Sequence, residues 1–162
     1  VYSSITLYVQ PQNDGTNTPG LISGSPTTAW TSLSNDVQLY LADKIPVGTT
    51  ITVQPPAYAR VYISMTVVVN AAYRNNTVKL NINKAFLDAN QLFAFENNTF
   101  GRSIAFSTVM AKAAGIAGVE SVTITKLNTD NSATAATISL AANQVPYLLP
   151  DDLIITASGG LS

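Results

Sequence analysis

Alternating apolar and polar residues mark the strands of this chain. From Ala59 to Val69 every odd position is apolar, which gives a long segment with a period of two. Because successive side chains of a strand point to opposite faces, we expect the odd face of this strand to be buried. The secondary structure of segment 132–149 is ambiguous from the sequence. Gly159-Gly160 is expected to end the last strand and so release the chain from it. Shorter strands are predicted at 5–9, 50–53, 119–127 and 153–156.

Apolar residues that recur at spacings of three and four predict three helices. The first covers 28–45, where the hydroxyl of Thr28 favours a helix N-terminus and Trp30 lies on the apolar stripe. The second helix covers 77–94, and the third, made mostly of small residues, covers about 104–114. Each helix is apolar on one stripe only, so each is expected to pack one face against a partner.

The order of these elements indicates an α+β domain. Strands and helices follow as strand–helix–strand–helix–helix–strand–strand, and one-sided helices bury their stripes well against a sheet. We therefore expect a two-layer sandwich, with a mixed or antiparallel sheet and about three helices on one face. A chain of 162 residues has the length of one typical domain. The sequence thus predicts a single α+β domain over 1–162, with a turn-rich loop at 11–26.

The charge content excludes several classes of partner. Charged residues make up 10% of the chain, against about 25% in an average globular domain, and the net charge is −1. Without a basic patch we expect no binding to nucleic acid or to an anionic membrane surface. No apolar run reaches the length of a membrane span, so we expect no span.

The absence of His and Cys removes much of the chemistry that enzymes use. Zinc sites built on cysteine, disulfides and Ser-His-Asp triads are all excluded. We expect no metal, no cofactor, no small-molecule substrate and no enzymatic activity. A glycosidase that works with two carboxylates alone remains an alternative, since such enzymes need neither residue type.

Two carboxylate-bearing segments are candidate sites. Asp151 and Asp152 are neighbours, and neighbours in a strand point to opposite faces, so they do not form one acid–base pair. Because they follow Pro150, they are predicted to be the polar residues of a turn. The segment 13–17 has the oxygen-rich composition of a calcium loop, but it lacks the alternating acids of such a site. It is predicted to be a turn.

The candidate contact residues are Tyr58, Arg60 and Tyr62, which lie close together just after Pro55-Pro56. Tyr and Arg are favoured in protein interfaces, so this group is a possible protein-contact patch. It also has the composition of a platform on which a sugar ring stacks. A plain alternative is a partly buried start of a strand, with Arg60 in solvent.

Three segments taken together resemble the C-terminal part of the baseplate J-like family. They are the strand Val61–Val69 with the helix behind it, the run Phe100-Gly101-Arg102-Ser103-Ile104 followed by a small helix and Ala117–Val122, and the closing Val145–Thr156 with Gly159-Gly160. The opening strand around Leu7 and the turn at Pro46 to Gly48 also fit, whereas the loop at 11–26 has no counterpart. The order of the motifs carries the resemblance.

The resemblance implies a structural, non-enzymatic subunit. Members of this family form the wedge of contractile phage tails and related injection machines, a ring around the tail hub that changes diameter on contraction. The chain is then expected to be a C-terminal fragment of a longer protein. That protein is expected in the virion tail baseplate, which is assembled in the cytoplasm of the host bacterium, or in an equivalent contractile injection particle. Its expected partners are other wedge and hub proteins and further copies of itself. The alternative function is a carbohydrate-binding or adhesin module of a tail tip.

Overall fold

The computed structural model describes residues 3–10, 28–88, 91–94, 97 and 99–161, without the side chains of 28–30. The chain divides into two compact units, residues 1–57 and 58–162, and each is described by itself. The single domain over 1–162 that the sequence predicts stays a prediction. The loop predicted at 11–26, its calcium-like segment 13–17 and the side chain of Trp30 lie outside the described residues.

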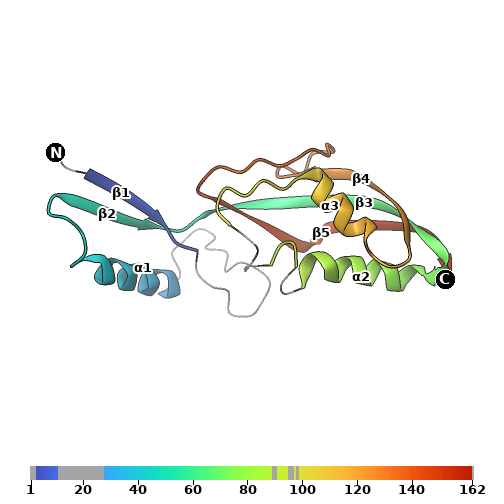
Figure 1. Ribbon diagram of the computed structural model, residues 1–162, viewed down its shortest axis with the longest axis horizontal. Coiled ribbons are helices and arrows are strands. Elements are labelled where there is room, and N and C mark those ends of the chain that lie inside the picture. The colour runs from blue at the N-terminus through green and yellow to red at the C-terminus, as the bar shows by residue number, and fades with distance from the viewer. Residues whose placement is uncertain (1–2, 11–27, 89–90, 95–96, 98, 162) are drawn as a thin grey trace. The chain divides into compact units, whose positions relative to one another are not determined.

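The first unit is built as a strand–helix–strand motif (Figure 1). Strand β1 (Ser3–Tyr8) pairs in parallel with β2 (Thr49–Gln54), and helix α1 (Thr28–Leu41) packs against β2. The two strands lie in full register from one end to the other. The helix ends earlier than the predicted position 45 because residues 42–44 form tight turns back onto its last residues.

Among its described residues, the second unit has the elements β3 (Ala57–Arg74), α2 (Asn75–Leu87), α3 (Phe106–Ala114), β4 (Val119–Asn128) and β5 (Gln144–Leu161). The sheet order is β4-β3-β5, and β3 and β4 are antiparallel. Arg60 meets Asp152 near the start of β3, and Val69 lies beside Gly159 further along, so β5 runs parallel to β3. The sheet is therefore mixed.

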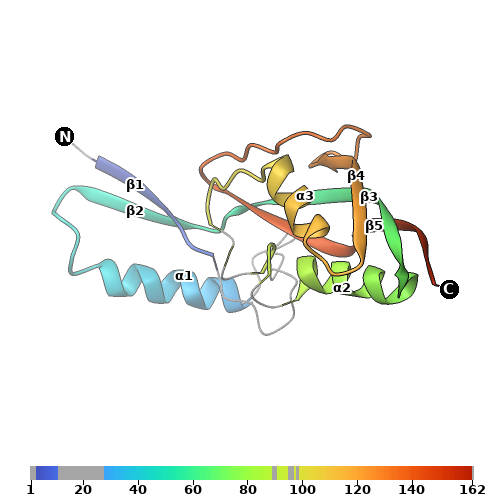
Figure 2. The ribbon, with the colours of Figure 1, turned by 45° about the vertical axis from the view of Figure 1, so that its right-hand side comes forward.

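The core of the second unit lies between the sheet and two helices (Figures 1 and 2). Helix α2 packs over β5 and α3 packs over β4, both on the odd face of β3. This confirms the prediction for the odd positions, which are all buried: Ala59, Val61, Ile63, Met65, Val67 and Val69. The α2 side chains in the core are Val78, Ile82, Ala85 and Phe86, and α3 adds Val109 and Ala113.

The α+β class is confirmed, but the helices are distributed differently from the prediction. Helix α1 packs on the two-stranded sheet, whereas α2 and α3 pack on the three-stranded sheet. None of the helices in the described ranges is long and apolar enough to cross a membrane.

The boundaries of the later elements differ from those predicted. Helix α2 ends at Leu87, seven residues early, because Asp88 adopts an extended conformation. Phe93, which lies within the predicted helix 77–94, is buried although it is not helical. Helix α3 begins at Phe106 because Ile104 is engaged in a backbone bridge to Ile138.

Two predictions about the closing segment are wrong. Asp151 and Asp152 do not lie in a turn, because β5 runs unbroken through both of them. Gly159 and Gly160 do not release the chain: they lie inside β5 with positive φ angles of 75° and 71°. The Gly159 carbonyl accepts a hydrogen bond of 3.1 Å from the Asn75 side chain, which joins the end of β5 to the start of α2.

Candidate functional site

Strands β3 and β5 bring five side chains together. All three sequence-predicted residues lie here: Tyr58, Arg60 and Tyr62 occupy the even positions of β3, opposite the buried odd positions. Tyr147 and Asp152 come from β5 and contact this group. We call these five residues the tyrosine–arginine cluster.

A two-pronged ion pair forms the centre of the cluster. Arg60 Nε donates to Asp152 Oδ2 at 2.7 Å, and its Nη2 donates to Oδ1 at 2.9 Å. The Asp152 side chain is only 6% exposed, while that of Arg60 is 42% exposed. The hydrogen bond to Asp152 raises the pKa of Arg60 above its ordinary value. Both carboxylate oxygens are occupied, so Asp152 is held as an anchor for the guanidinium.

Tyr62 fixes the guanidinium from another side. The Arg60 Cζ atom lies 5.2 Å from the centre of the Tyr62 ring, within the range of a cation–π contact. Arg60 is therefore held by a carboxylate and by an aromatic face at once, and it is not free in solvent. A side chain held in this way loses little further conformational freedom when it binds a partner.

Tyr58 and Tyr147 pack against each other edge to face. Their ring centres are 6.3 Å apart and their planes meet at 85°. Burial raises the pKa of both phenols above the ordinary value. Tyr147 is 9% exposed, so its ring does not offer the open flat face on which a sugar stacks. The geometry favours the protein-contact interpretation over the sugar platform.

The Tyr58 hydroxyl leads to a prediction about stability. Its oxygen is buried and has no hydrogen-bond partner among the described residues. A buried polar group without a partner costs about 1–3 kcal/mol. We expect Tyr58→Phe to raise the free energy of unfolding by about 1 kcal/mol, measured by urea denaturation of the whole chain. Tyr62→Phe is the control and should change it by less than about 0.5 kcal/mol. A loss of stability in Tyr58→Phe would contradict the orphaned hydroxyl.

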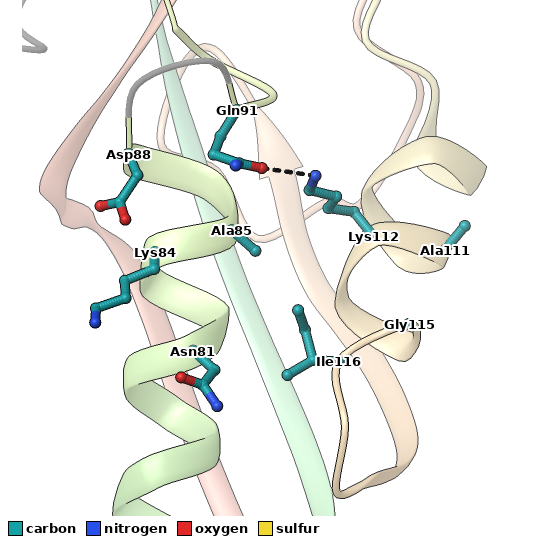
Figure 3. Close-up of a pocket in the computed structure, with 9 residues that line it drawn as sticks. All are labelled: Asn81, Lys84, Ala85, Asp88, Gln91, Ala111, Lys112, Gly115 and Ile116. Atoms are coloured by element: carbon teal, nitrogen blue, oxygen red, sulfur yellow. Dashed lines mark hydrogen bonds between the residues drawn. The ribbon is translucent and has the colours of Figure 1, made fainter.

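Apart from this cluster, the second unit has a concave feature between α2 and α3. It is an open groove of about 440 Å³. Figure 3 shows Lys84 and Asp88 pointing away from α3, on the far side of α2. The Lys112 amine donates to Gln91 Oε1 at 2.8 Å. A small-molecule site requires polar side chains that converge on one point, and the polar side chains of this groove do not.

No family is assigned to this chain by similarity to known proteins. It matches no protein-family model and no curated protein sequence. Membership of the baseplate J-like family therefore stays a prediction.

Sequence reasoning missed the two β5 members of the cluster. Tyr147 and Asp152 lie in a stretch interrupted by Pro146 and Pro150, which hid the strand. One feature pointed to Asp152: an acidic residue directly before the apolar run Leu153–Ile155 requires a partner once that run is buried.

Proposed function

We propose that this chain is a structural, non-enzymatic subunit that binds neighbouring proteins through the sheet face bearing the tyrosine–arginine cluster. The observation that carries the proposal is the immobilised Arg60, which is partly exposed and held by Asp152 and Tyr62. Arg and Tyr are the residue types that contribute most to binding energy at protein interfaces.

The sheet face around the cluster suits such a contact. Between positions 60 and 68 of β3 it carries Tyr62, small hydroxyl residues and the 38% exposed Val68. On β5 it continues to Ile154, which is 54% exposed. On this face of β3 and β5 the Arg60–Asp152 pair is neutralised internally, and the neighbouring β4 adds the charge of Lys126, the register partner of Ser64. A surface of this kind is inexpensive to desolvate, because few charges lose their hydration.

The proposed place of this subunit is the wedge of a contractile-tail baseplate, or of an equivalent injection particle. The resemblance of segments 61–69, 100–122 and 145–160 to the baseplate J-like family supports this. Its partners would be other wedge and hub proteins and further copies of the chain in the ring. The low charge and the scarcity of catalytic residue types agree with a role in assembly.

Tyr62→Ala tests the proposal. Tyr62 lies on the face opposite the core, so we expect its removal to lower the free energy of unfolding by no more than about 1 kcal/mol. It also releases Arg60 on one side, so incorporation of the full-length protein into baseplates should fall at least about tenfold. Incorporation is measured by quantifying the subunit in purified particles, and stability by thermal unfolding.

Tyr62→Phe is the matched control for this test. It keeps the aromatic face beneath the guanidinium, so both assembly and stability should be retained. Normal incorporation of Tyr62→Ala, or a large loss of stability, would overturn the proposal. Binding of the chain to a glycan array that depends on Tyr62 would instead favour the adhesin alternative.

A further inference from the structure

Strand β1 of the first unit has one edge without a partner strand among the described residues. Strand β1 pairs only with β2 in the described part of the chain. Ser3 N donates to Gly48 O and Val9 N donates to Gln54 O, so the odd residues of β1 direct their amides toward β2. Because amide direction alternates along a strand, Ser4, Thr6 and Tyr8 direct their N–H and C=O groups to the outer edge. This edge is a template for another strand.

Apolar side chains beside this edge are poorly covered. Ile5 is 50% exposed and Leu7 is 37% exposed, although their register partners include the buried Val53. Helix α1 packs against β2, and Val53 on that strand is buried. In the described part of residues 1–57, the apolar side of β1 thus lacks the cover that β2 has.

The β1 edge also lacks the usual features that prevent strand pairing. Natural edge strands are protected by charged residues, proline or bulges. Strand β1 reads SSITLY and has none of these, whereas the edge strand β5 contains Pro146 and Pro150. The two edge strands therefore differ in protection, and the β1 edge is the one left open to a partner strand.

We propose that the β1 edge pairs with the β1 strand of a second copy of this chain, antiparallel and centred on Thr6. In this register Thr6 faces its own copy and Ser4 faces Tyr8 of the copy. These are the residues whose backbone groups point outward, so about six N–H···O bonds form without disturbing the pairing with β2. The resulting order is β2-β1-β1-β2 across a two-fold axis.

The side chains of β1 are self-complementary in the same register. Ile5 of one copy lies opposite Leu7 of the other, on the face that also carries Ile51 and Val53. Cross-strand apolar pairs of this kind stabilise a sheet. The strand is uncharged, so the two copies meet without repulsion between like charges. A copy of β1 therefore fits the edge both in hydrogen bonding and in burial. This inference uses only the first unit and is independent of the tyrosine–arginine cluster.

A single cysteine tests the pairing, because the chain contains no cysteine of its own. Across the two-fold axis the Cα atoms of the two Thr6 residues would be about 5.5 Å apart, within the range that a disulfide spans. We expect Thr6→Cys to form a covalent dimer under mild oxidation with copper phenanthroline. The dimer is measured on a non-reducing gel over a range of protein concentrations.

Thr52→Cys is the matched control. Thr52 is the register partner of Thr6 on β2 and is also exposed, on the same face. In the proposed dimer two strands separate the two Thr52 residues, about 14 Å apart, which is too far for a disulfide. We expect Thr6→Cys to cross-link at least about tenfold faster than Thr52→Cys. Equal rates, or a Thr6→Cys chain that stays monomeric, would overturn the proposal.

Discussion

Val67→Asp is expected to abolish folding of the unit formed by residues 58–162. Val67 is fully buried on β3, the middle strand of the sheet, and faces the core formed with α2 and α3. An unpaired carboxylate in such a place costs several kcal/mol, a large fraction of the about 5–15 kcal/mol that stabilises a typical domain. Far-UV circular dichroism should lose its helical component, and the cooperative thermal transition should disappear.

The neighbouring Val68 provides a control that differs only in its face. Val68 is 38% exposed and lies on the opposite side of the same strand. Val68→Asp introduces the same charge and the same loss of β-propensity, and we expect it to cost no more than about 1.5 kcal/mol. A folded Val67→Asp protein, or equal damage from both variants, would contradict the assignment of the odd face to the core.

Strand β3 was predictable because its pattern is local. One face is buried along the whole segment 59–69, so apolar residues fall at every second position and the period shows directly in the sequence. The helices α2 and α3 were predictable for the same reason, since each buries one stripe. Only their ends were misjudged: Phe93 continues the apolar spacing of α2 but reaches the core from a non-helical segment.

Strand β5 was not predictable because its environment changes along its length. Residues 145–148 are all buried, so this part has no alternation, and the alternating part begins only after Pro150. The ion pair between Arg60 and Asp152 joins residues 92 positions apart. A contact of that separation depends on the parallel pairing of β3 with β5. The sequence therefore indicated three of the five residues of the tyrosine–arginine cluster, and the fold supplied Tyr147 and Asp152.

The glycines of β5 illustrate the same dependence on a distant strand. A Cβ atom on Gly159 would lie 2.7 Å from the backbone oxygen of Val69, closer than such atoms approach. On Gly160 it would lie 2.8 Å from the oxygen of Tyr73. Both have positive φ, so each position combines a left-handed conformation with a close approach of backbone. Glycine is required here by the neighbouring β3, and nothing in the surrounding sequence of β5 indicates it.

Gly159→Ala is accordingly expected to lower the free energy of unfolding by about 3 kcal/mol. The left-handed conformation alone costs an alanine about 1–2 kcal/mol, and displacing the Val69 carbonyl in the central strand adds to this. The loss is measured by urea denaturation of the whole chain. Gly48→Ala, where φ is also positive and nothing lies within 4 Å of the added atom, should cost only the conformational part.

Gly159→Asn separates the two contributions at one position. Asn tolerates the left-handed conformation better than Ala, but it carries the same Cβ atom. If the contact with Val69 dominates, Gly159→Asn should be at least as destabilising as Gly159→Ala. Recovery of most of the stability by Asn would mean that conformation alone selects glycine, and that a Cβ atom at this position does not meet the Val69 oxygen at 2.7 Å. Because Gly159 also accepts the hydrogen bond from Asn75, a shift of β5 here would loosen the start of α2 as well. The helical circular dichroism signal should therefore fall at a lower urea concentration in Gly159→Ala than in the wild-type chain.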